Sequence, residues 1–250
     1  MSVTIWEGIY SSFQEAPSIG NGFHGEVWIN KSLEKITTIK KEFCEKGYSL
    51  LGGRNAVLPV VVSILYAKKN KIKILDVGGG IGFDYYAVSN SLSSKQGFEF
   101  HILDIEEICL AGSHFFKEES NIKFHSTLPE DINDFDVIHL GSSLQYIEKW
   151  QYFLRKLCDL NPECIVFTDL LAGNFSTFVS TQNYYTSKIS VYFFNIGEII
   201  SLLNEKSYKL IYKSNYLATI RGVEQKLPLE NFPKELRLNH ALNCIFIKYC

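Results

Sequence analysis

A run of glycines follows an acidic residue in the stretch IKILDVGGGIGFDYY, residues 72–86. An apolar run ends at Asp76, and a helical pattern of apolar residues resumes beyond the glycines. A glycine turn between a strand and a helix brings backbone N–H groups close to a ligand. The G-x-G-x-x-G spacing of dinucleotide sites does not fit, because its third glycine would fall on Phe83 or Tyr85, and no Walker lysine is present. The residues that do fit form an acid-x-G-x-G-x-G pattern: Asp76, Gly78, Gly80 and Gly82.

This register resembles motif I of the class I S-adenosylmethionine (SAM) methyltransferases. The resemblance implies that the glycines let the backbone curve under the methionine and ribose of SAM. It also implies that Asp76 steadies the loop and the amino group of the cofactor, and that S-adenosylhomocysteine (SAH) is the product. The glycines expected at the cofactor are Gly78, Gly79, Gly80 and Gly82. The alternative is a glycine turn that binds no ligand.

A second acid follows the next apolar run, in FHILDIEEI. A ribose with two free hydroxyls needs a bidentate acceptor at the end of the second strand, and Asp104 stands there. Ile105 would then pack on the adenine. The alternative for Asp104 is an ordinary helix N-cap, because a helical pattern begins directly after it.

The stretch FDVIHLGSSLQYIEKW predicts a fourth strand that Asp136 opens. Gly141 and Ser142 fall at its carboxyl end, where open α/β sheets bind ligands. The resemblance adds these two residues and Leu128 to the expected cofactor contacts. The N/D-P-P-Y motif of the amino-methylating nucleic-acid enzymes is absent at this point, which argues against a DNA substrate.

A more specific group within this family is indicated by four segments that occur in this order: IWEGIYSSFQEA, LDVGGGIGFDYY, HILDIEEICLAG and SSLQYIEKW. Together they resemble a group of methyltransferases associated with bacterial surface-polysaccharide genes, over most of the chain up to about Gly173. This implies methylation of a small molecule or a glycan, at oxygen of a sugar, although the link to a substrate is only an association.

Methyl transfer from a sulfonium is an in-line displacement, so the protein must align the nucleophile with the methyl group. A hydroxyl nucleophile also has to lose its proton to a base. The catalytic candidates are His139, Asp169 and Gln145, with Asp169 as base or substrate hook and Gln145 orienting a hydroxyl. The alternatives are a core histidine at His139 and a cap or turn acid at Asp169.

Three further residues are candidates for substrate binding. His24 lies in a glycine-rich loop that could fold over the site, Arg54 could reach a carboxylate or phosphate, and Tyr146 follows the fourth strand. Surface positions are the alternatives for His24 and Arg54. The stretch STQNYYTSKISVYFF combines the hydroxyls, amides and aromatic rings of sugar sites, and the alternative there is an edge strand with a loop.

The elements that position these residues are visible from residue 72 onward, where strand and helix patterns alternate. Such alternation predicts βαβ units and a parallel sheet. The last two apolar runs, YKLIYKSNYLATI and NCIFIKY, have no helix between them, so they should pair antiparallel at the sheet edge. The predicted fold class is α/β, a Rossmann-like seven-stranded sheet of five parallel strands plus an antiparallel edge pair, with helices on both faces and an N-terminal cap.

Two helices have recognisable ends. SLEKITTIKKEFCEKG predicts a helix with Leu33, Ile36, Ile39 and Phe43 inward and Gly47 after its end. NIGEIISLLNEKSY predicts a helix capped by Asn195, with Glu198 in a capping-box position. We expect residues 1–70 to form a cap over the ligand edge and residues 71–250 to form the SAM-binding domain.

Net charge, apolar runs and cysteine spacing indicate which partners, sites and location to expect for this protein. The 250 residues carry a formal charge of −2, so a nucleic-acid partner is not expected. The longest apolar run is shorter than the ~20 residues of a membrane helix, and no signal peptide is recognised. The six cysteines form no C-x-x-C pair, so no metal site is expected, and scattered thiols suggest a reducing compartment, the cytoplasm. The competing functions are a non-catalytic scaffold in glycan assembly and a nicotinamide oxidoreductase.

Overall fold

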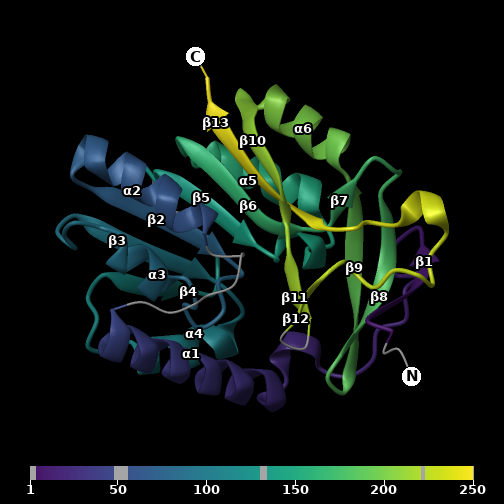
Figure 1. Ribbon diagram of the computed structural model, residues 1–250, viewed down its shortest axis with the longest axis horizontal. Coiled ribbons are helices and arrows are strands. Elements are labelled where there is room, and N and C mark those ends of the chain that lie inside the picture. The colour runs from purple at the N-terminus through teal and green to yellow at the C-terminus, as the bar shows by residue number, and fades with distance from the viewer. Residues whose placement is uncertain (1–3, 48–55, 130–133, 221–222, 250) are drawn as a thin grey trace.

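The computed structural model describes residues 4–47, 56–129, 134–220 and 223–249. Its main sheet has seven strands in the order β10-β13-β6-β5-β2-β3-β4 (Figure 1). β4, β3, β2, β5 and β6 are parallel, while β13 runs antiparallel to both β6 and β10. The predicted fold class is therefore confirmed. The strands are β2 (Ile72–Val77), β3 (Phe98–Leu103), β4 (Ile122–His125), β5 (Val137–Gly141), β6 (Cys164–Leu170), β10 (Tyr208–Tyr216) and β13 (Ala241–Lys248).

Helices cover both faces of this sheet. They are α1 (Glu26–Lys46), α2 (Val57–Lys69), α3 (Tyr85–Asn90), α4 (Glu106–Phe115), α5 (Trp150–Asp159) and α6 (Ile196–Glu205). Alternate residues of a strand point to opposite faces. Ile74 of β2 accordingly packs with α1 to α4, whereas Leu75 packs with α5 and α6. Because both of their faces are buried, the inner parallel strands β2, β3, β5 and β6 are mostly apolar, as the sequence indicated.

The two predicted helix ends are confirmed. α1 ends at Gly47, which has a left-handed φ of +75°. Asn195 caps α6 by accepting a hydrogen bond from the Gly197 N–H at 2.8 Å. Glu198 instead accepts a hydrogen bond from the Thr177 hydroxyl at 2.9 Å, so it ties α6 to the segment before β8.

A second sheet, which the sequence did not predict, has the order β1-β8-β9-β7. Its strands are β1 (Trp6–Tyr10), β7 (Ala172–Gly173), β8 (Phe178–Tyr184) and β9 (Ser187–Asn195). The stretch flagged for its sugar-site composition forms the hairpin of β8 and β9, and β1 from the N-terminal region pairs with β8. The hairpin stands beside the main sheet (Figure 1). The division at residue 70 stays a prediction, but β1 and β8 come from opposite sides of that boundary.

Smaller elements complete the chain: the short helices η1 (Gly22–His24), η3 (Leu144–Tyr146) and η4 (Lys234–Leu236), and the strand pair β11 (Ala218–Ile220) and β12 (Val223–Gln225). Within the described ranges, no helix has both the length and the apolar character needed to cross a membrane. Five cysteines fall in these ranges and all are free thiols, of which only Cys44 is exposed.

The packing of α4 on β4 gives a stability prediction. A Cβ atom at Gly112 would lie 2.2 Å from Cε1 of Phe124, so Gly112→Ala must displace the ring. We expect the free energy of unfolding, measured by chemical denaturation, to fall by about 1–3 kcal/mol. Leu110→Ala on the exposed side of the same helix is the control and should change it much less. Equal stability of Gly112→Ala and wild type would contradict this packing.

Candidate functional site

A cavity of about 910 Å³ lies at the carboxyl ends of β2, β3, β5 and β6. This is within the usual range of small-molecule and cofactor sites. One wall comes from the main sheet and includes Gly78, Gly80, Asp104, Ile105, Leu128, Gly141, Ser142, Gln145, Tyr146 and Asp169. The facing wall includes Trp6, Phe23, Trp28, Gln182, Tyr184, Tyr216 and Leu227. Most of the residues predicted from the sequence therefore gather around one space.

The four glycines of the loop divide into two pairs. Gly78 and Gly80 line the cavity and have left-handed backbone, with φ of +68° and +59°. Gly79 and Gly82 face the protein instead. A Cβ atom at Gly79 would lie 2.4 Å from Oδ2 of Asp76, and one at Gly82 would press on Phe116 and neighbouring core side chains. A Cβ atom at Gly78 would likewise lie 2.5 Å from Cβ of Ser143, and one at Gly80 would lie 2.7 Å from Cε2 of Phe83. All four glycines therefore let the loop fit closely against the protein, and Gly78 and Gly80 also line the cavity.

Asp104 holds the loop from the neighbouring strand. Its Oδ2 accepts a hydrogen bond from the Gly80 N–H at 2.9 Å, and its Oδ1 accepts one from the Ile105 N–H at 2.8 Å. The N-cap of α4 is Ile105, and no side chain caps that helix. Burial raises the pKa of Asp104, and the two backbone hydrogen bonds partly oppose this rise. Each carboxylate oxygen has a second lone pair, so both remain able to accept a hydroxyl of a ligand.

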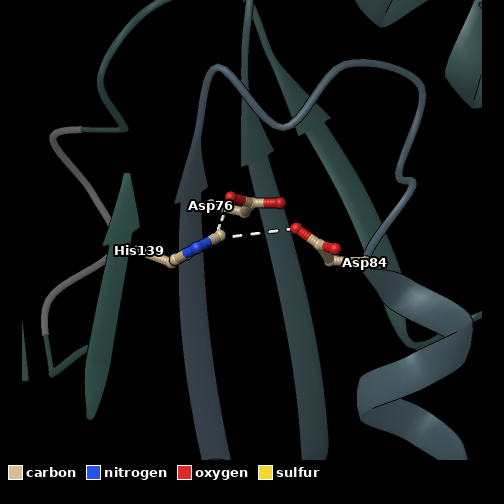
Figure 2. A group of neighbouring side chains, drawn as sticks. All are labelled: Asp76, Asp84 and His139. Atoms are coloured by element: carbon tan, nitrogen blue, oxygen red, sulfur yellow. Dashed lines mark hydrogen bonds and ion pairs between the residues drawn. The ribbon is translucent and has the colours of Figure 1, made fainter. Parts of the chain in front are cut away.

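His139 lies beneath the loop, with 1% of its surface exposed, and does not line the cavity. Its Nδ1 donates a hydrogen bond to Oδ1 of Asp76 at 2.8 Å and lies 3.8 Å from Oδ2 of Asp84 (Figure 2). Its Nε2 lies 2.9 Å from the Thr168 hydroxyl. Both ring nitrogens therefore have partners inside the core. This placement favours the core alternative over a direct role in proton transfer.

Asp76, Asp84 and His139 are also the group of described side chains whose donor atoms converge closely enough for a metal ion, all within 4.8 Å. Figure 2 shows the two carboxylates and the imidazole pointing toward one another. The hydrogen bond between His139 and Asp76 accounts for the closeness of that pair. The cluster places buried negative charge directly below the glycine loop.

A further group of predicted residues lines the cavity: Gln145, Tyr146 and Asp169. The Gln145 amide donates to Oγ of Ser142 at 3.1 Å and to the Asp169 carbonyl at 3.2 Å. The Tyr146 hydroxyl donates to Oε1 of Gln182 on β8 at 2.8 Å. The predicted catalytic acid and amide are therefore adjacent, and Tyr146 connects the main sheet to the second one.

One of the predicted substrate residues, His24, is not part of the cavity wall. His24 is exposed, and its Nδ1 lies 3.1 Å from Oε1 of Glu107. It does not line the cavity, although the preceding Phe23 does. Arg54 lies outside the described residues.

The sequence predicted only part of the aromatic cluster in the cavity wall: Tyr146 and the stretch that contains Tyr184, but not Phe23 and Trp28. Phe23 packs against Tyr146 with ring centroids 5.0 Å apart, and against Tyr184 at 5.1 Å. Trp28 packs against Tyr184 at 5.6 Å. These rings come from η1, α1, η3 and the β8–β9 hairpin, so no local pattern joins them. The available signal was the aromatic-rich composition of the N-terminal and hairpin segments.

The chain is similar in fold to known methyltransferases. Magnesium protoporphyrin IX methyltransferase from Synechocystis PCC 6803, with bound SAH, superposes with a TM-score of 0.52 at 12% identity, over 79% of this chain and 84% of that one. A 1,6-didemethyltoxoflavin-N1-methyltransferase from Burkholderia thailandensis, with bound 1,6-didemethyltoxoflavin and SAH, gives 0.53 at 12% identity, over 96% and 100%. A SAM-dependent methyltransferase from Clostridium acetobutylicum gives 0.53 at 10% identity, over 87% and 99%.

No family model matches the sequence, and no curated protein matches it significantly. The structural likeness, at these low identities, shows that the chain has the Rossmann-like fold of the class I SAM-dependent methyltransferases.

The buried cluster below the loop gives a second prediction. His139→Leu removes the hydrogen-bond donor of the buried Asp76 carboxylate, and we expect it to lower the free energy of unfolding by about 3–5 kcal/mol. His139→Asn keeps an N–H near the position of Nδ1, so it should lower the free energy of unfolding by clearly less than His139→Leu does. Urea denaturation of the two variants measures the difference. If both variants lost the same free energy of unfolding, His139 would stabilise the fold by filling volume and not by its hydrogen bond to Asp76.

Proposed function

We propose that the protein is a methyltransferase that uses SAM, releases SAH and methylates a small-molecule or glycan acceptor at oxygen. The observation that carries this proposal is the contact between Asp104 and Gly80. It places a carboxylate with open lone pairs against a left-handed glycine loop on the wall of one cavity. Ile105 and Leu128 add apolar surface beside it.

The residues present fit SAM by their chemistry. Asp104 can accept both ribose hydroxyls, and Gly78 and Gly80 line the cavity beside it. Ile105 and Leu128 suit an adenine ring. SAM, when bound, supplies a methyl group on an activated sulfonium leaving group. The protein's contribution is then to align the acceptor and to take up its proton.

Asp169 is the base in this proposal. It lines the cavity at the end of β6, and its backbone is held by Gln145 and by Asn243, whose Oδ1 accepts from the Asp169 N–H at 3.3 Å. A carboxylate there can accept the proton of an acceptor hydroxyl as the C–O bond forms. His139 supports the loop through Asp76 and takes no part in this transfer.

The facing wall supports a sugar as the acceptor. Trp6, Tyr184 and Tyr216 provide aromatic surface for the C–H faces of a pyranose, and Gln182 provides an amide near them for hydroxyls. The resemblance in the first 173 residues associates such an activity with surface-polysaccharide synthesis, and we propose the cytoplasm as its location. Two of the structural neighbours named above are methyltransferases of magnesium protoporphyrin IX and of 1,6-didemethyltoxoflavin, so the fold does not by itself indicate a sugar as the acceptor.

Cofactor binding is the direct test. We expect SAM and SAH to raise the melting temperature, because a ligand at 100 times its Kd stabilises the native state by about 2.7 kcal/mol. NADH is the control and should leave the melting temperature unchanged. A shift with NADH and none with millimolar SAM or SAH would reject the proposal in favour of an oxidoreductase.

Asp104→Ala tests the ribose contact. The substitution removes the two proposed charge-assisted hydrogen bonds from the ribose hydroxyls to Asp104, each worth roughly 1.5–3 kcal/mol. SAH affinity measured by calorimetry should therefore fall by about 100-fold or more. Glu106→Ala, an exposed acid in the first turn of α4, is the matched control and should leave affinity nearly unchanged. A loss of thermal stability with unaltered SAH binding would assign Asp104 to the fold alone.

The same contact predicts a pH dependence. Because burial raises the pKa of Asp104, its carboxylate should protonate at a higher pH than an ordinary aspartate as the solution is acidified. Protonation removes the charge that strengthens the ribose hydrogen bonds, so SAH affinity should fall in the acidic range. The Asp104→Ala variant should lack this fall.

A further inference from the structure

Two strand ends in the cavity wall have an unusual backbone. Ser142, directly after β5, has φ of +57°, and Asp169, near the end of β6, has φ of +56°. Neither residue is glycine, so each is held in a conformation that costs free energy. Such strain persists only where surrounding contacts impose it, and it concentrates at functional sites. Both residues line the cavity, so these contacts decide how two strands present side chains to a ligand.

Gln145 makes a contact with each of the two strained residues. Its Nε2 donates one hydrogen bond to Oγ of Ser142 at 3.1 Å and another to the Asp169 carbonyl at 3.2 Å. The Ser142 N–H donates to the Thr168 carbonyl at 2.8 Å, which adds a direct tie between the two strands. The Gln145 side chain thus joins the ends of β5 and β6 from the turn that follows β5.

The remaining atom of the Gln145 amide, Oε1, is a buried hydrogen-bond acceptor. Both amide hydrogens are used, which fixes which way the carboxamide points. Oε1 is buried and has no hydrogen-bond partner among the described residues, while the residue as a whole is 1% exposed and lines the cavity. Buried polar atoms in native proteins normally have a partner.

We propose that Gln145 is the positioning residue of the site: it holds Ser142 and Asp169 in left-handed backbone, so that both strand ends face the ligands. The proposal rests on the proposed function, since the ligand on the Ser142 side is SAM. Gln145 acts here through the Ser142 hydroxyl and the Asp169 backbone carbonyl rather than by orienting the acceptor hydroxyl. Glycine adopts left-handed backbone without the penalty of a Cβ atom, and this provides a specific test.

The experiment is a double-mutant cycle read by SAH calorimetry. Gln145→Ala in the wild-type background should weaken SAH binding by about tenfold or more, because the strained conformation at Ser142 is no longer imposed. In the Ser142→Gly background, the same Gln145→Ala change should cost less than about threefold, since glycine needs no such support. Because Ser142→Gly also removes the Oγ that Gln145 contacts, the control is Gln145→Ala combined with Ser142→Ala, which lacks Oγ but keeps Cβ; it should bind SAH about tenfold more weakly than Gln145→Ala combined with Ser142→Gly. Gln145→Met, which keeps the volume and removes both donors, is measured in the same two backgrounds.

Each outcome bears on one of the two proposals. An equal loss of SAH affinity in both backgrounds, or no loss in either, would overturn the positioning role. Chemical denaturation provides the second readout: a purely structural Gln145 would lower stability without the background-dependent change in affinity. Failure of the wild-type protein to bind SAH would instead reject the proposed function itself, before any variant is compared.

Discussion

The hydrogen bond from the Gly80 N–H to Asp104 is the contact on which the arrangement of the site depends. It joins the loop after β2 to the end of β3, and thereby fixes the loop on the side of the sheet where the strands end. Parallel strands place all their carboxyl ends at one edge, so residues far apart in sequence meet there. Because of this geometry, residues at the ends of three different strands line one cavity: Asp104, Ser142 and Asp169.

The loop is also supported from below by charge. Asp76 is buried at the end of β2, and an isolated buried carboxylate would be very unfavourable. His139 on β5 offsets this cost by donating to Asp76, and Thr168 on β6 hydrogen-bonds the other ring nitrogen. Three adjacent strands are linked in this way under the glycines. The polar groups near the ligand edge therefore have two separate tasks: those in the cavity wall face ligands, and those beneath it keep the loop in place.

The parts of the fold that sequence could predict are those with local patterns. Apolar runs that alternate with helical spacing defined the main sheet, and Asn195 and Gly47 marked helix ends by their own chemistry. The second sheet has no such signal, because β1 pairs with β8 across more than 160 residues of chain. The left-handed backbone at Ser142 and Asp169 could not be predicted either, since neither is glycine and nothing in the local sequence marks their conformation. The core partners of His139 also required the register of β5 against β2 and β6.

The two walls of the cavity differ in how they are built, and this bears on specificity. The wall with Gly80 and Asp104 consists of strand ends held by backbone hydrogen bonds, so a change there disturbs the main sheet. The facing wall uses side chains such as Trp6, Tyr184 and Tyr216 from β1, β8 and β10, whose rings can change without altering the glycine loop. Tyr146 touches both walls, through Gln182 on β8 and through its position beside Gln145. In the proposed enzyme, the acceptor can therefore be selected by the facing wall while the cofactor contacts remain the same.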